Sequence, residues 1–191
     1  MRLTIFNARD IFFTLLLSSS LLAVTGQVHA EKADSQKEMT IDTEHVVRDG
    51  KTGVSTLTGN VIITRGTLLV KAARAVITTT PDNFQHVTLF CPPGGKVTFR
   101  QKRDGGPDLW VDGEADKIEY DEKTEFAKFI SKAKVRYLDG KKVTDEQDGE
   151  FLSYDSKNDV FVGTNSNNGE SVAGAGRVRI TIQPRTDKQG K

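Results

Sequence analysis

Hydrophobic and polar residues alternate with a period of two along most of the chain beyond residue 39. In the first clear segment, Leu57, Val61 and Ile63 fall on one face and mostly polar residues fall on the other. The same alternation returns in residues 68–76, 96–100, 132–137 and 177–182. Such a pattern is typical of β-strands with one apolar face and one solvated face.

Clusters of Gly, Pro, Asn and Asp interrupt these segments about every eleven to eighteen residues, which leaves strands of about five to ten residues. Residues 121–134 are the one stretch that could pass for a helix, but their apolar positions do not hold a period of about 3.6 residues. The chain is therefore expected to be all-β, antiparallel and poor in helix.

A weak internal repeat runs through the same region. Residues 73–78, 115–120 and 149–154 resemble one another, and the last two copies lead into the same Tyr-Asp-x-Lys tetrapeptide. The copies lie about 34 to 42 residues apart, as expected of hairpin pairs stacked into an elongated sheet. The two ends of such a sheet are open strand edges unless another segment covers them.

The first thirty residues have a different composition. Arg2 and Arg9 precede or flank an apolar run at 11–24, and Val28-His29-Ala30 follows it with a small-x-small cleavage signature. A run of about fourteen residues rising ~1.5 Å each is too short to cross ~30 Å of hydrocarbon, which argues against a membrane anchor. We expect a secretory signal peptide at 1–30, a flexible leader at 31–38, one folded domain at 39–183 and a flexible tail at 184–191. The protein would then be exported and released.

Charge and cysteine content exclude further classes of function. The chain has 27 Lys and Arg and 26 Asp and Glu, and removal of Arg2, Arg9 and Asp10 with the signal peptide leaves 25 of each. Nucleic acid is therefore not an expected partner, because its binding needs a basic excess. Cys91 is the only cysteine, so neither an intrachain disulfide nor a Cys-x-x-Cys site can form.

No catalytic motif stands out. His45 and His86 lie outside any metal-ligand spacing, and Cys91 precedes a Pro-Pro-Gly loop without an evident base. Serine-nucleophile and phosphate-loop motifs do not occur in the sequence. Four carboxylates lie close together in sequence, at Asp112, Glu114, Asp116 and Glu119. Their place on alternating strands favours a solvated face over a glycosidase pair, so we expect a binding or scaffolding protein without metal or cofactor.

The inward apolar residues have two possible roles. They form the core of a closed sandwich, or the two sheets splay and leave an apolar seam open to a lipid, whose burial would contribute ~0.8 kcal/mol per methylene. Periodicity alone does not separate these two arrangements.

Three blocks of sequence are distinctive: Met39-Thr40-Ile41-Asp42-Thr43-Glu44, Leu57-Thr58-Gly59-Asn60-Val61-Ile62-Ile63-Thr64-Arg65-Gly66-Thr67-Leu68, and Ala73-Arg74-Ala75-Val76. Together with the export signal, they resemble the LptA (OstA-like) family of periplasmic lipopolysaccharide transport proteins of Gram-negative bacteria. The resemblance covers roughly residues 37–183, nearly the whole exported chain.

This resemblance implies an elongated, twisted antiparallel β-jellyroll, V-shaped in section and open at its ends, that holds the lipid A acyl chains of lipopolysaccharide on its apolar inner face. It implies head-to-tail stacking of copies by β-augmentation, and contacts with an LptC-like inner-membrane protein and the LptD outer-membrane barrel in the periplasm. Met39, Ile41 and Phe99 match positions where family members contact lipid. The full predicted lipid-binding set is Met39, Ile41, Val61, Ile63, Leu68, Val70, Val76, Val97, Phe99, Ile118, Tyr120, Val135 and Tyr137.

Two other interpretations stay open at this point. One is a periplasmic β-sandwich that binds a glycan or acts as a structural module, and the other is a jellyroll hydrolase. A glycan-binding protein should expose aromatic platforms, but this chain has one Trp and three Tyr. A hydrolase should bring polar residues together into one cluster.

Overall fold

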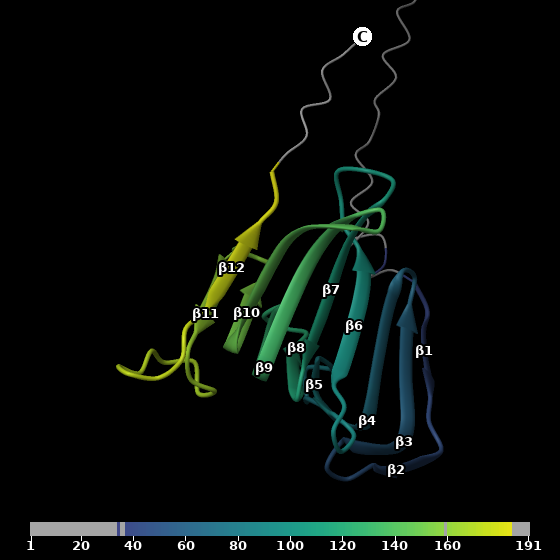
Figure 1. Ribbon diagram of the computed structural model, residues 1–191. Coiled ribbons are helices and arrows are strands. Elements are labelled where there is room, and N and C mark those ends of the chain that lie inside the picture. The colour runs from purple at the N-terminus through teal and green to yellow at the C-terminus, as the bar shows by residue number, and fades with distance from the viewer. Residues whose placement is uncertain (1–33, 35–36, 159, 185–191) are drawn as a thin grey trace, which may run out of the picture.

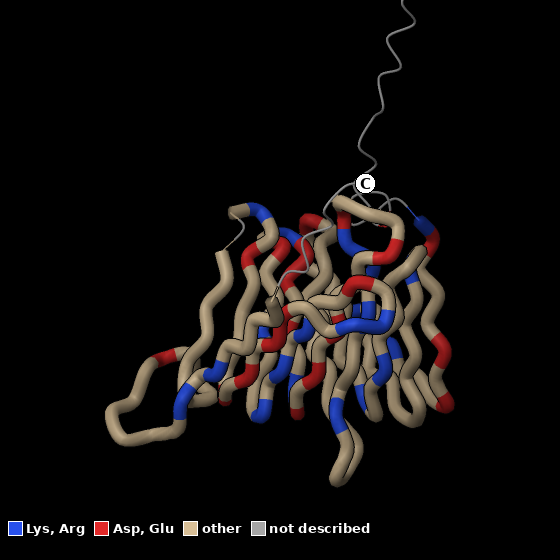
Figure 2. Tube along the Cα trace, turned by 45° about the horizontal axis from the view of Figure 1, so that its top comes forward, with Lys and Arg blue, Asp and Glu red and all other residues tan. Residues whose placement is uncertain are grey.

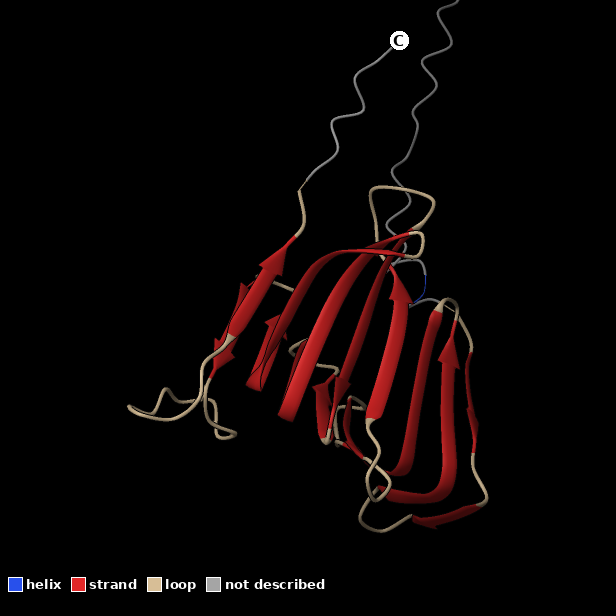
Figure 3. Cartoon of the chain, viewed as in Figure 1, coloured by secondary structure: helices blue, strands red, loops and turns tan. Residues whose placement is uncertain are grey.

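The structure is a computed structural model that describes residues 34, 37–158 and 160–184 (Figure 1). The predicted signal peptide and residues 185–191 of the predicted tail lie outside the described residues. The strands are β1 (Met39–Asp42), β2 (His45–Asp49), β3 (Val54–Arg65), β4 (Leu68–Thr79), β5 (Gln85–Phe90), β6 (Val97–Lys102), β7 (Leu109–Ala115), β8 (Lys117–Asp121), β9 (Phe126–Asp139), β10 (Lys142–Asp155), β11 (Val160–Thr164) and β12 (Arg179–Ile182). Strands dominate the described chain (Figure 3), which confirms the predicted all-β class.

All twelve strands belong to one antiparallel sheet with two halves. Four long strands, β3, β4, β9 and β10, run through both halves. The first half has the order β2-β3-β4-β5-β8-β9-β10-β11 and is here called the β5/β8 half. The second has the order β1-β3-β4-β6-β7-β9-β10-β12 and is called the β6/β7 half.

Irregular backbone marks the boundary between the halves. On β3, Gly59 and Asn60 have φ angles of 84° and 44°, and the pairing with β4 shifts by one residue between Thr58 and Val61. On β9, Ser131 and Lys132 also have positive φ, at 64° and 51°. Bulges of this kind bend a strand sharply. The bends bring the apolar faces of the two halves toward each other.

Contact between the halves is direct at Phe99 and Phe129. Phe99 lies on β6 and Phe129 lies on β9 beside β8, and their ring centroids are 5.3 Å apart with the ring planes tilted by 34°. Tilted aromatic pairs at this distance stabilise a core beyond the area that they bury. The crease of the bent sheet is therefore filled by side chains from both halves.

Rows of register partners build the core. In the β5/β8 half the buried row is Leu57, Ala75, Leu89, Ile118, Phe129 and Leu152. In the β6/β7 half the facing row is Ile41, Ile63, Val70, Phe99, Gly113 and Val135. Each row crosses the sheet at a right angle to its strands, so the apolar interior extends from one end of the molecule toward the other.

The bend also corrects one predicted position. Val70 and Ala72 are buried on β4, but beyond the bend the buried residues are Ala75 and Ile77, so the alternation has shifted by one residue. Val76, predicted to face inward, therefore points to the outer face, where it pairs with Thr56 and Thr88. Strict period-two counting from Val70 misses the shift because nothing in the sequence of this segment marks the bend.

Part of the predicted leader packs against the domain. Asp34 is 2% exposed and accepts a hydrogen bond of 2.9 Å from the backbone N–H of Thr67, in the turn between β3 and β4. Lys37 forms an ion pair of 3.3 Å with the same carboxylate. The described part of the tail, Pro184, is exposed.

Candidate functional site

Apart from Val76, which lies on the outer face, the predicted lipid-binding residues fall into two groups by exposure. Six are buried in the crease, namely Val61, Ile63, Val70, Val97, Ile118 and Val135. Six others remain partly or largely open to solvent, namely Met39, Ile41, Leu68, Phe99, Tyr120 and Tyr137. The buried group forms the core, and the second group lines the open side of the bent sheet.

The lining group lies toward the outer margins of both halves. Met39, Leu68 and Tyr137 occur near the ends of their strands in the β6/β7 half, and each packs against the buried core. Tyr120, which is 39% exposed, pairs with Val87 at the corresponding margin of the β5/β8 half. We call this apolar surface, from the crease to the two margins, the inner face.

Several inner-face residues escaped prediction. Val87, Val111 and Phe161 are half-buried and pack against the same core, and Leu89 and Phe129 belong to it. Val87 and Leu89 alternate in the sequence and could have been found. Val111 and Phe161 belong to strands of seven and five residues, in which too few apolar positions repeat to fix the face.

The ring of Phe99 packs on a glycine of the inner face. Its ring lies over Gly113, its register partner on β7, so close that a β-carbon at position 113 would overlap the ring and lie 2.5 Å from Cδ1. Gly113 has no positive φ, so its role is to make room for the ring. The same ring also packs against Phe129, with the two ring centroids 5.3 Å apart. The glycine thus fixes how far Phe99 projects from the sheet.

Charged residues of both signs are spread along the strands (Figure 2), and on the outer face they form cross-strand pairs. Arg136 bridges Glu146 at 2.8 Å and Glu114 at 3.4 Å, and its hydrogen bond to Glu146 lowers the pKa of that carboxyl below its ordinary value. Lys96 hydrogen-bonds Asp116 at 2.6 Å and likewise lowers its pKa.

The four carboxylates considered above as a possible hydrolytic site therefore lie in cross-strand and near-neighbour ion pairs. Asp112 pairs with Arg100 at 3.1 Å, and Glu119 pairs with Lys117 at 2.8 Å. Pairs of this kind are typical of a solvated strand face.

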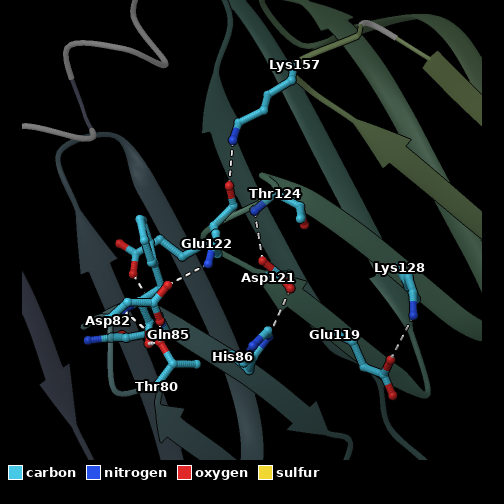
Figure 4. Close-up of polar contacts among 12 residues, drawn as sticks. Thr80, Asp82, Gln85, His86, Glu119, Asp121, Glu122, Thr124, Lys128 and Lys157 are labelled. Carbon is cyan, nitrogen blue, oxygen red and sulfur yellow. Dashed lines mark hydrogen bonds and ion pairs between the residues drawn. The ribbon is translucent and has the colours of Figure 1, made fainter.

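A second polar cluster ties the turns at the margin of the β5/β8 half (Figure 4). His86 Nδ1 lies 3.1 Å from the Asp121 carboxylate, and the Gln85 N–H donates to Glu122 at 2.9 Å. Asp82 accepts a 2.5 Å hydrogen bond from Lys123, which lowers the pKa of Asp82 to about 2. These contacts join the β4–β5 turn to the β8–β9 turn and give the cluster a structural role.

Both ends of the sheet have strands with one neighbour among the described residues. β1 and β2 pair only with β3, and β11 and β12 pair only with β10. The exposed apolar residues concentrate there: Val46 and Val47 on β2, Val160 and Val162 on β11, and Ile180 and Ile182 on β12. Exposed apolar strand edges of this kind are sites for pairing with another chain.

Comparison with known proteins agrees with this architecture. Residues 40–160 match the family model described as LptA/(LptD N-terminal domain) LPS transport protein. The chain belongs to this family. The resemblance stated from the sequence is thereby confirmed.

Curated relatives in the family cover most of the chain. The lipopolysaccharide export system protein LptA of Haemophilus influenzae is 30% identical over 143 residues, which span 75% of this chain and 79% of that protein. The protein of the same name from Escherichia coli is 30% identical over 143 residues, spanning 73% and 76%.

A solved structure supports the fold. The crystal structure of LptH from Pseudomonas aeruginosa, described as the LptA-homologous periplasmic component of the lipopolysaccharide transport device, matches with a TM-score of 0.66. The match has 18% identity and covers 79% of this chain and 99% of LptH. The bent antiparallel sheet is therefore the β-jellyroll of this family, as predicted.

In the described part of the chain no helix is long and apolar enough to span a membrane, and no group of three or more acidic, His or Cys residues could hold a metal ion.

Proposed function

We propose that this protein binds lipopolysaccharide in the periplasm, shelters its acyl chains on the inner face, and forms part of a bridge between the two membranes by head-to-tail stacking. The observation that supports it most is the pairing of an apolar inner face with open, apolar strand edges at both ends of the sheet. Lipopolysaccharide export is what the curated relatives are named for.

The inner face suits acyl chains because it is apolar and continuous. Its partly exposed lining, which includes Ile41, Leu68 and Phe99, borders a core of aliphatic residues. Each methylene removed from water there would contribute ~0.8 kcal/mol, so even a partial acyl chain gives useful affinity. Polar recognition is not required for this part of the ligand.

Strand direction permits stacking without a break in the sheet. Each half has eight strands that alternate in direction, so its first and last strands run opposite ways. A second copy placed end to end would set its β1 antiparallel to β12 and its β2 antiparallel to β11. Both halves, and the inner face between them, would continue across the junction.

The hydrogen-bonding groups of β12 are oriented for this junction. The Gln183 N–H donates to Thr144 O on β10 at 2.8 Å. Because donors alternate in direction along a strand, the N–H groups of Ile180 and Ile182 point away from β10, toward the open edge. If the core rows continue, Ile180 would lie beside Ile41 of the next copy.

The same geometry would let the chain join other proteins with a similar fold. The N-terminal edge would receive an LptC-like inner-membrane protein, and the C-terminal edge would meet the LptD barrel, with the direction set by which edge each partner offers. The transport energy would come from a cytoplasmic ATPase, and this chain would act without catalysis.

Two experiments test the proposal. The first compares lipopolysaccharide co-purified with the wild-type protein and with Ile41→Asp, which places a charge on the inner face; the variant should retain at most a small fraction of the lipid. Retention of lipid by an Ile41→Asp protein that is folded by circular dichroism would contradict the inner-face assignment.

The second experiment uses Ile180→Pro, which removes an outward N–H while leaving the β10 ladder intact, since proline is tolerated on an edge whose N–H faces solvent. Sedimentation should show self-association with concentration for the wild type and for the control Ile180→Val, but not for Ile180→Pro. Equal association of the proline variant would refute stacking through β12.

A further inference from the structure

We propose that the inner face includes an anion subsite, formed by Arg65 and Arg103 at one margin of the β6/β7 half, that takes a phosphate group of the bound lipid. The inference rests on the proposed function, because the phosphate is expected to be joined to the acyl chains that the inner face shelters.

Arg65 is an unusual residue for its position. It follows Val61 and Ile63 in the inward alternation of β3, and its Nη2 lies 3.9 Å from the sulfur of Met39, which packs against the core. Its Nε is buried and has no hydrogen-bond partner among the described residues. A buried guanidinium donor without an acceptor destabilises a protein unless a ligand supplies the acceptor.

Arg103 reaches the same margin from β6. It directly follows the strand, and its guanidinium carbon lies 4.4 Å from the ring centroid of Tyr137, another inner-face residue. Stacking on an aromatic ring holds a guanidinium in place while its edge N–H groups stay available to a further acceptor.

The fold brings the two arginines to one place. β3 and β6 both pair antiparallel with β4, so they run in the same direction and end at the same margin (Figure 1). One strand separates β3 from β6, which sets these two strands about 9–10 Å apart. Arg103 lies two residues beyond Gln101, the position level with Arg65, so the backbones of the two arginines are about 12 Å apart. Two long side chains at this separation can converge on one phosphate or hold two neighbouring ones.

The chemistry of the surroundings selects the ligand class. Guanidinium groups bind phosphate through paired, charge-assisted hydrogen bonds. Met39, Leu68 and Tyr137 form the apolar surface beside the two arginines. Asp145 also faces inward, as the register partner of Tyr137 on β10. A ligand with a phosphate attached to acyl chains fits both surfaces.

The test measures binding of three probes to the purified full-length exported protein: diphosphoryl lipid A, dioleoylglycerol as an uncharged acyl lipid, and inorganic phosphate. The variants are Arg65→Gln, Arg103→Gln and the pair. Arg100→Gln is the matched control, because Arg100 stacks on Trp110 at 4.6 Å in the same way but on the outer face, paired with Asp112. Circular dichroism and urea unfolding check that each variant is folded.

Each inner-face substitution should weaken diphosphoryl lipid A about tenfold, the loss expected from one charge-assisted hydrogen bond. Dioleoylglycerol should bind as before, Arg100→Gln should have no effect, and the wild-type affinity for lipid A should fall with added salt. Inorganic phosphate should compete only at millimolar concentration if the acyl chains supply most of the affinity.

Three results would overturn the subsite: no loss with either variant, equal loss for both lipids, or equal loss with Arg100→Gln. If the wild-type protein binds neither lipid, the proposed function fails. The subsite is then decided separately by whether inorganic phosphate shifts the NMR side-chain signals of Arg65 and Arg103.

Discussion

The packing of the Phe99 ring on Gly113 can be tested by substitution of the glycine. Gly113→Ala places a methyl group where the ring of Phe99 now lies, with Cδ1 only 2.5 Å from the new carbon. Gly113 is not among the glycines with positive φ, so alanine there adds no strain of the left-handed kind. The ring must move away from β7, which also disturbs its packing on Phe129 at 5.3 Å.

The expected cost follows from that displacement. Overpacking of a well-fitted core costs about 1–3 kcal/mol, and loss of glycine from a strand offsets about 0.5 kcal/mol of it through the unfolded state. We therefore expect Gly113→Ala to lower the free energy of unfolding by about 1–2.5 kcal/mol. In a Phe99→Ala background the ring atoms nearest to the new methyl group are gone, and the same substitution should be neutral or slightly stabilising.

A double-mutant cycle measures this difference. Urea unfolding followed by far-UV circular dichroism, with the slope m held common, should give a coupling energy of about 1–3 kcal/mol between positions 99 and 113. Gly50→Ala is the control, because no atom lies within 4 Å of its β-carbon position. If the two substitutions are additive within about 0.5 kcal/mol, the Phe99 ring does not pack on Gly113.

Three further predictions follow from other parts of the sheet. Ala75→Leu should lower the free energy of unfolding by about 1–3 kcal/mol in thermal or urea unfolding, because Ala75 is fully buried. Val76→Thr on the outer face should change it by less than about 0.5 kcal/mol. A larger loss from Val76→Thr than from Ala75→Leu would show that Val76, and not Ala75, faces inward. Arg136 lowers the pKa of Glu146 in the folded protein below the ordinary value of 4.5, so the pair stabilises the protein above pH 4.5 and this stabilisation is lost as the pH falls further. Glu146→Gln should therefore make stability fall less steeply at acid pH. An unchanged acid dependence would show that the pair does not cause it. Gly59→Ala should lower the free energy of unfolding by about 1 kcal/mol or more, because Gly59 has φ +84° at the bend and the new carbon would meet Glu44. An unchanged free energy of unfolding would show that the bend accepts a residue with a side chain.

Local pattern was enough to predict much of the fold. Period-two alternation identified the strands around Val61, Val97 and Val135, and turn residues marked their limits, because both depend on near neighbours in sequence. The bend was not predictable in this way. Asn60, Ser131 and Lys132 have positive φ at the boundary between the halves, and their residue types do not by themselves mark a bend. Near the same boundary the buried alternation of β4 changes face, which places Val76 on the outer face.

The inner face was harder to predict for a second reason. Alternation assigns apolar residues inward and charged residues outward, so Arg65 and Arg103 were not recognised as inner-face residues. Their position became visible only through Met39 and Tyr137, which lie far away in sequence but adjacent in the folded sheet. Functional sites are where local rules of patterning most often fail.

In the proposed function the inner face, and not the outer face, holds the acyl chains. This is tested most directly by a photo-crosslinking amino acid introduced in living cells at Ile41 or Phe99 on the inner face, and at Lys71 or Arg100 on the outer face. Lipopolysaccharide adducts are expected from the two inner positions, and none above background from the two outer ones. Equal adducts from both faces would contradict it.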